Sequence, residues 1–151
     1  MFATSAVAAM SAQFPSGTRV GFDLVCVSGV ADSIARFGEA FRRRVFTPGE
    51  LEYADAGTGL CAQRLAARLA AKEAVIKALK LSNAGIGWRD IEVRKCADGD
   101  CELALHGRAA EAARAAGVAR MLLSLSHDGD YAGAIVAALP GERADLTAVA
   151  P

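Results

Sequence analysis

The sequence predicts an α+β domain with a small antiparallel sheet and packed helices over residues 19–139. Three features predict it: an apolar, β-branched run near the start, a long amphipathic helix in the middle, and two alternating runs that each contain a glycine turn. The order strand, helices, hairpin, helix, hairpin lacks the regular strand–helix alternation of a parallel sheet. We therefore expect antiparallel strands.

The first elements follow from residue type and end signals. The run RVGFDLVCV, residues 19–27, is expected to be a buried strand because it is rich in β-branched and apolar residues. A helix over residues 30–46 follows and contains three consecutive arginines. The segment TPGELEYAD begins another helix, in which Thr47 caps the N terminus, a proline takes the first helical position, and Glu50 completes a capping box.

The second half alternates helices with hairpins. The segment RLAARLAAKEAVIKALK, residues 64–80, is the long amphipathic helix. Residues 90–107 form two alternating strands around a glycine turn, and a short alanine-rich helix over about residues 107–116 ends at a glycine. Residues 121–139 form a second hairpin that turns at residues 128–130.

Both ends of the chain are expected to lie outside this domain. Residues 1–18 are small and apolar, but they lack the basic start and the apolar length of a signal peptide, so we expect a flexible leader. Residues 140–151 are expected to form a frayed tail. Since no run of about 20 apolar residues exists, no membrane span is expected.

Composition excludes several classes of function. The chain has 151 residues, 53% of them hydrophobic and 23% charged, which fits one globular domain. Its 17 basic and 17 acidic residues balance, so the overall charge gives no case for nucleic-acid binding. Four cysteines show no zinc-ligand spacing, and we expect them to be reduced in the cytoplasm. Cys96 and Cys101 could face each other across the first hairpin, which leaves a disulfide open but not required.

The long helix places charges on and beside its apolar face. With Leu65 as the reference direction, Lys72 lies about 20° from the centre of the face, Arg68 about 60° to one side and Glu73 about 80° to the other. Four apolar residues lie within roughly 40° of the reference: Cys61, Leu69, Ile76 and Leu79. The structural interpretation is that Lys72 extends its ammonium group to solvent while Glu73 pairs with Lys77.

The functional interpretation combines these charges with two further residues. Asp23 lies inside an apolar strand, where a buried carboxylate needs a cation, and with Glu73 it could supply two oxygen ligands to Mg²⁺. His127 and Ser126 end a strand and could donate hydrogen bonds to a phosphate. Three cations of the long helix accompany them: Arg68, Lys72 and Lys77. Each residue also has an ordinary structural explanation, but together they favour a site for a polyphosphate ligand.

Five segments carry a resemblance to a known family. GFDLV, FTPGEL, RLAAKEAVIKAL, WRDIEV and SLSHDGDYA occur in this order over residues 19–139. In sequence and spacing they resemble the holo-acyl carrier protein synthase family of phosphopantetheinyl transferases. The resemblance implies the phosphopantetheinyl transferase fold and an enzyme that moves the phosphopantetheine arm of coenzyme A to a serine of an apo acyl carrier protein, releasing adenosine bisphosphate.

The resemblance also implies roles for individual residues. Asp23 and Glu73 match the family's metal ligands for Mg²⁺, and Glu73 matches the catalytic base, acting directly or through a water on the metal. Lys77 matches a catalytic residue that also contacts the phosphates of coenzyme A. Arg68 and His127 match positions that contact its ribose phosphate. The resemblance assigns no role to Lys72.

Partners are implied in the same way. The family is homotrimeric with active sites between subunits, acts in the cytoplasm, and serves fatty-acid biosynthesis, although the sequence leaves a polyketide carrier open. Gly29 stands where many relatives have an arginine for carrier docking, and the run Arg42, Arg43 and Arg44 could replace that contact by steering an acidic carrier. The alternative is a non-catalytic module that binds coenzyme A or a nucleotide.

Overall fold

The computed structural model describes residues 14–141. The predicted leader, residues 1–18, lies mostly outside the described residues, and so does the predicted tail, residues 140–151. Among the described residues, no helix has both the length and the apolar character needed to cross a membrane.

The described chain has the α+β composition that the sequence predicts. Its elements are, in chain order, β1 (Arg19–Cys26), α2 (Val27–Val45), α3 (Pro48–Asp55), α4 (Cys61–Leu79), the 3₁₀ turn η1 (Trp88–Asp90), β2 (Ile91–Lys95), β3 (Cys101–Leu105), α5 (Gly107–Ala115), β4 (Val118–Asp128) and β5 (Tyr131–Pro140). Both hairpins, the alanine-rich helix and the long helix lie where the sequence places them.

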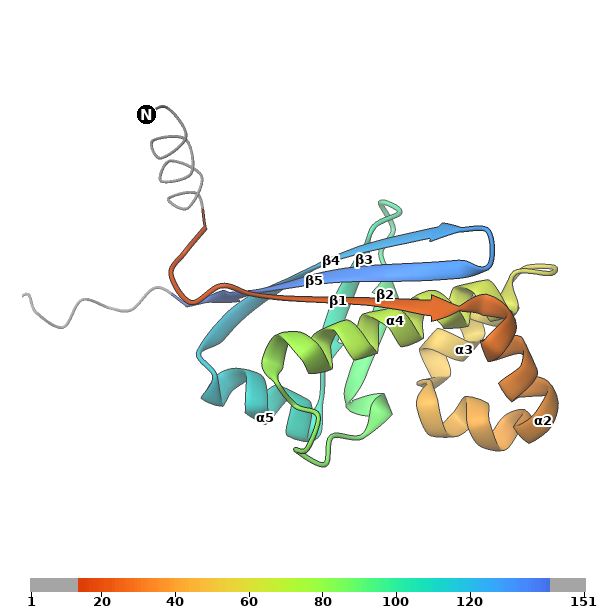
Figure 1. Cartoon of the computed structure of the whole chain (residues 1–151), viewed down its shortest axis with the longest axis horizontal. Helices are drawn as coiled ribbons and strands as arrows, with labels where there is room; N and C mark the ends of the chain where they lie inside the picture. Colours follow the sequence, from red (N-terminus) through yellow and green to blue (C-terminus); the bar gives the residue numbers. More distant parts are fainter. Residues whose placement is uncertain (1–13, 142–151) are drawn as a thin grey trace, which may run out of the picture.

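The strands form two antiparallel sheets instead of one. One sheet has the order β1-β5-β4, and β2 and β3 form a separate hairpin. Helix α4 packs against the three-stranded sheet, with α2 and α3 near one end of the molecule and α5 near the other (Figure 1). This arrangement makes α4 the central element of the fold.

The central position of α4 explains why its burial differs from the predicted single stripe. Residues on almost all of its sides are buried: Leu65, Ala66, Ala67, Arg68, Ala70, Ala71, Lys72, Ala74, Val75, Ala78 and Leu79. Leu69 and Ile76, which the wheel placed near the centre of the apolar face, are only partly buried. The many alanines allow the sheet, α2, α3 and β2 to approach the helix from different directions.

Strand β1 approaches α4 so closely that one position requires glycine. A Cβ atom at Gly21 would lie 1.8 Å from the backbone oxygen of Ala74. Glycine therefore brings the β1 backbone against the helix, and Asp23, two residues later, faces the same side of the sheet.

The predicted cap of α3 is confirmed. The Glu50 backbone N–H donates to the Thr47 side chain (3.3 Å), and the Thr47 backbone N–H donates to the Glu50 carboxylate (2.9 Å). Helix α2 starts at Val27, before the predicted start, and breaks at Gly38, whose φ of 57° lies in the left-handed region.

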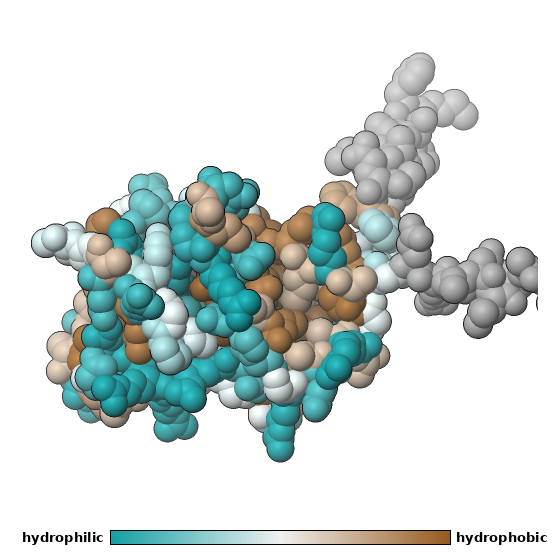
Figure 2. Space-filling model, turned by 180° about the vertical axis from the view of Figure 1, so that it is seen from behind, coloured by the Kyte–Doolittle hydropathy of each residue, from teal (hydrophilic) through white to brown (hydrophobic). Residues whose placement is uncertain are grey.

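The sequence predicted that strand β1 is buried, but the structure buries only one of its two faces. Its outward-facing residues Val20, Phe22 and Leu24 are 65%, 55% and 56% exposed. Tyr131, Ile135 and Leu122 of the neighbouring strands are also exposed. The outer face of the three-stranded sheet is therefore apolar and uncovered in the single chain. Figure 2, seen from behind, also shows hydrophobic side chains gathered toward the right of the coloured surface.

Candidate active site

The first cluster of predicted site residues lies between β1 and α4. Lys77 Nζ is 2.5 Å from Asp23 Oδ1 and donates to the backbone oxygen of Phe22 (3.2 Å). The Asp23 side chain is 19% exposed and that of Lys77 is 53% exposed, so the pair opens to solvent on the lysine side. In the described part of the chain, the ion-pair partner of Lys77 is Asp23, so the predicted Glu73–Lys77 pair is wrong.

Glu73 shares the electrostatic environment of this pair. Partial burial raises the pKa of Glu73, the negative charge of Asp23 raises it further, and the positive charge of Lys77 opposes both. The hydrogen bond to Asp23 raises the pKa of Lys77. Two nearby carboxylates thus share a single lysine, and the negative charge left over favours the binding of an additional cation beside them.

The donor set of this cluster fits Mg²⁺. Within residues 14–141, no three or more His, Cys, Asp or Glu side chains gather as a metal site. Mg²⁺ needs no such cage, because it is usually bound by one or two carboxylates and completes its shell with water and substrate phosphates. Asp23 and Glu73 offer two carboxylates of this kind.

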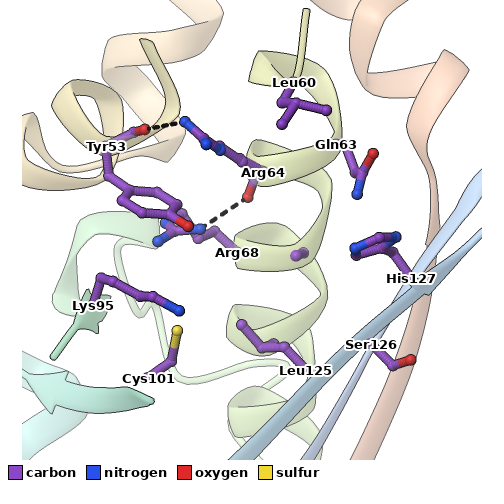
Figure 3. A pocket seen from close by; sticks show the side chains of 11 residues that line it. Tyr53, Leu60, Gln63, Arg64, Arg68, Lys95, Cys101, Leu125, Ser126 and His127 are labelled. Carbon is purple, nitrogen blue, oxygen red and sulfur yellow. Dashed lines mark hydrogen bonds between the residues drawn. The ribbon is translucent and has the colours of Figure 1, made fainter. Parts of the chain in front are cut away.

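The second cluster surrounds a cavity on the other side of α4. The cavity has a volume of about 310 Å³, and both Arg68 and His127 line it (Figure 3). The other lining residues are Tyr53, Leu60, Gln63, Arg64, Ala67, Lys95, Cys101, Leu125 and Ser126. The His127 ring points toward the cavity, whereas the Ser126 hydroxyl points away from it (Figure 3). The structure therefore places Arg68 and His127 at one cavity.

Arg68 carries hydrogen-bond donors without a partner. Its side chain is only 3% exposed, and Nη1 donates to the backbone oxygen of Arg64 (3.2 Å). Its Nε and Nη2 atoms are buried and have no hydrogen-bond partner among the described residues. Burial lowers the pKa of Arg68, but arginine keeps its proton in proteins. A buried guanidinium with free donors beside a cavity is suited to bind an anion.

The two clusters lie apart in the single chain. Asp23 is on β1 and His127 is on β4, the two outer strands of the sheet, with β5 between them. On α4, Lys77 contacts β1, whereas Arg68 contacts Tyr53 of α3. This matches the wheel, which placed Arg68 and Glu73 on opposite edges of the helix.

Lys72 does not reach solvent, so the structural prediction for this residue is wrong. Lys72 and Glu50 are both fully buried, with Nζ 2.8 Å from Oε2. Lys72 also donates to the backbone oxygen of Trp88 (3.0 Å) and to that of Ile91. Because α3 and β2 cover this side of α4, no solvent path remains, and the Glu50 carboxylate supplies the counter-charge.

Arg42 also differs from its predicted role. It forms ion pairs with Glu39 (2.7 Å) and Asp55 (2.6 Å), so its charge is already balanced. Arg43 and Arg44 are exposed, and Arg43 Nε lies 3.5 Å from Glu39 Oε2 in a solvent-exposed ion pair. Arg43 and Arg44 are therefore the more exposed residues of the arginine run.

Several residues of the cavity were not predicted from the sequence. Arg64 could have been found, because it precedes Arg68 by four residues and so lies on the same flank of α4. Tyr53, Lys95 and Cys101 come from α3 and the β2–β3 hairpin, whose packing against α4 no local pattern reveals.

Comparison with known proteins places this chain in a family. The profile of the 4′-phosphopantetheinyl transferase superfamily matches residues 19–136. The chain belongs to this superfamily. It is 42% identical over 121 residues to a holo-[acyl-carrier-protein] synthase from Gloeobacter violaceus, covering 80% of this chain and 92% of that protein. A protein of the same name from Koribacter versatilis is 41% identical, with 77% and 93% covered.

A solved structure agrees with the sequence comparison. The ACPS–CoA complex from Chronobacterium ammoniagenes is 34% identical and has a TM-score of 0.70, with 80% of this chain and 95% of that chain covered. The family match over residues 19–136 spans the chain segments in which both clusters lie. All four cysteines are free thiols, so the disulfide left open between Cys96 and Cys101 is not present.

Proposed function

We propose that this chain transfers the 4′-phosphopantetheine group of coenzyme A to a serine hydroxyl of an apo acyl carrier protein and releases adenosine 3′,5′-bisphosphate. The observation that carries this proposal is the pair of clusters: carboxylates with a lysine on one side of α4, and a cationic cavity on the other. Relatives at about 40% identity carry the name of this activity over most of the chain.

The carboxylate cluster is proposed to act on the pyrophosphate and the serine. Asp23 and Glu73 would hold Mg²⁺, which when bound neutralises the charge that builds on the leaving phosphate. Glu73 takes the proton of the serine hydroxyl, because a hydroxyl is a weak nucleophile until a base accepts its proton. Lys77 has three donors, two of which bond to Asp23 and Phe22, so the third remains to contact a phosphate oxygen.

The cavity is proposed to hold the other end of coenzyme A. Arg68 offers two donor nitrogens that have no partner among the described residues, and His127 points toward the same space, which together suit the ribose phosphate (Figure 3). Fixing this remote phosphate orients the pyrophosphate for attack, so binding energy far from the reacting atoms lowers the barrier.

A homotrimer is proposed to complete the site. The outer face of the three-stranded sheet exposes several large apolar side chains, including Phe22 and Leu24, and such a face favours association with a second copy. Because the two clusters lie on opposite edges of one sheet, the carboxylate cluster of one copy and the cavity of the next can together contact one coenzyme A molecule.

Carrier docking and cellular location complete the proposal. Arg43 and Arg44 are exposed basic residues on α2 and are proposed to steer the acidic carrier protein of fatty-acid biosynthesis. The four free thiols fit a reducing compartment, so we place the enzyme in the cytoplasm.

Mass spectrometry tests the proposed reaction directly. A purified apo acyl carrier protein is incubated with coenzyme A, Mg²⁺ and this protein, and its mass should increase by one phosphopantetheine group. A carrier whose acceptor serine is replaced by alanine is the control and should not change. Binding of coenzyme A without any mass increase on several carriers would favour the alternative of a non-catalytic binding module.

A further inference from the structure

A second arginine lies beside Arg68 and is held in place from several sides. Arg64 Nη1 donates to the backbone oxygen of Tyr53 (3.0 Å), and its Cζ lies 4.8 Å from the centre of the Tyr53 ring. A Cβ atom at Gly57 would lie 2.9 Å from Arg64 Nη1, so the loop backbone passes directly over this guanidinium. Arg64 is thus an ordered residue of the cavity wall and not a freely solvated side chain.

The ring of Tyr53 contacts both arginines. Arg68 Cζ lies 4.0 Å from the centre of the ring, closer than that of Arg64. A guanidinium that stacks on an aromatic ring is stabilised through its face, while its edge N–H groups stay available for hydrogen bonds. Figure 3 shows both arginine side chains next to Tyr53 at the wall of the cavity. This agrees with the two donor nitrogens of Arg68, Nε and Nη2, that have no partner within residues 14–141.

The positive charge of this wall has no counter-ion within residues 14–141. Neither Arg64 nor Arg68 forms an ion pair with a described carboxylate, and no carboxylate is among the described residues that line the cavity. Lys95 and His127 line it as well. Two neighbouring guanidiniums repel each other, so an anion that bonds to both removes an unfavourable interaction. A phosphate monoester carries nearly two negative charges at neutral pH and is better suited to this than a singly charged group.

We propose that Arg64 is a second phosphate-binding residue of this cavity and that Tyr53 positions Arg64 and Arg68, so that the protein selects coenzyme A over 3′-dephospho-coenzyme A. The inference rests on the proposed function, in which Arg68 and His127 hold the ribose phosphate. It adds two residues that determine specificity. Arg64 contacts the ribose phosphate, and Tyr53 acts only by positioning the two guanidiniums.

Isothermal titration calorimetry without a carrier protein tests the proposal. We expect wild type to bind coenzyme A more tightly than 3′-dephospho-coenzyme A. Arg64→Met should reduce this preference about tenfold, the usual effect of losing a charge-assisted hydrogen bond, and should leave the Kd of the dephospho compound unchanged. Arg64→Lys keeps the charge but loses the forked donors, so its preference for coenzyme A should lie between those of wild type and Arg64→Met. Arg114→Met removes an exposed arginine of α5 and should change neither Kd.

Two variants of Tyr53 separate positioning from a contact through the hydroxyl. Tyr53→Phe keeps the ring and should keep the preference, whereas Tyr53→Leu loses the ring and should reduce it several-fold. Melting temperatures are measured for every variant, and Arg64→Lys replaces Arg64→Met if the latter does not fold.

Clear outcomes would overturn the proposal. Equal weakening of both ligands by the Arg64 variants, an unchanged preference, or a wild type without any preference would each exclude Arg64 as a phosphate ligand. Loss of the preference in Tyr53→Phe would exclude the positioning role of the ring. A wild type that prefers coenzyme A in binding but never modifies a carrier would instead refute the transferase activity and leave the assignment of Arg64 intact.

Discussion

Removing one partner of the buried Lys72–Glu50 pair should lower the free energy of unfolding by several kcal/mol. Both side chains are fully buried and 2.8 Å apart, so Lys72→Met leaves the Glu50 carboxylate inside the protein without its cation. Breaking such a pair usually costs about 3–5 kcal/mol. Glu50 keeps two backbone donors, the N–H groups of Thr47 and Val93, both at 2.9 Å, so we expect a loss near the lower limit, about 3 kcal/mol.

Urea denaturation followed by circular dichroism measures this loss as a change in the free energy of unfolding. The double variant Lys72→Met/Glu50→Gln should be more stable than Lys72→Met alone, because no buried charge remains. Lys80→Met, at an exposed lysine just after α4, is the matched control and should change stability by less than about 0.5 kcal/mol. A loss in Lys72→Met no larger than that of the control, or a double variant less stable than Lys72→Met, would contradict a buried charge left without its partner.

Three further predictions concern packing, docking and pH. Gly21→Ala should destabilise the protein by about 3 kcal/mol or more in the same urea assay, because the new methyl group overlaps the α4 backbone; a near-normal variant would contradict the close approach. Replacing Arg43 and Arg44 with alanine should raise the KM for the carrier protein and weaken its dependence on salt, and a loss in kcat alone would refute the docking role. Hydrogen bonds from Ser28 lower the pKa of Asp130 below 3.8, so its stabilising effect should be present above pH 3.8 and be lost as the pH falls through the folded-state pKa. The melting temperatures of wild type and Asp130→Ala should therefore differ at neutral pH and converge in acid; a constant difference would contradict this.

Local signals in the sequence were sufficient for most elements of the fold. Thr47 and Glu50 show why: a capping box depends on residues three positions apart, so it can be recognised without tertiary information. The same holds for the glycine turns of the two hairpins. The division into two sheets could not be predicted, because it depends on how β2 and β3 pack against α4, and no short-range pattern encodes that packing.

The candidate site shows the same limit. The wheel placed Arg68 and Glu73 on opposite edges of α4, and the structure agrees. It could not show that α3 covers Lys72. The lysine was therefore predicted to reach solvent, whereas it forms a buried ion pair with Glu50. It also could not show that Asp23, far away in sequence, would take Lys77 as its ion-pair partner in place of Glu73. Such pairings depend on contacts between distant segments, for which one sequence contains little information.

Asp23 and Glu73 are proposed to hold jointly the Mg²⁺ used in phosphopantetheine transfer. The most direct test is the rate of holo-carrier formation, followed by mass spectrometry, as Mg²⁺ is added back to chelated wild type, Asp23→Ala, Glu73→Gln and the double variant. We expect Mg²⁺ to restore the wild type, each single variant to lose about a hundredfold or more in kcat/KM, and the double variant to be little worse than either, because both residues serve one ion. Losses that simply multiply in the double variant, or full activity of the chelated wild type, would contradict a shared metal site.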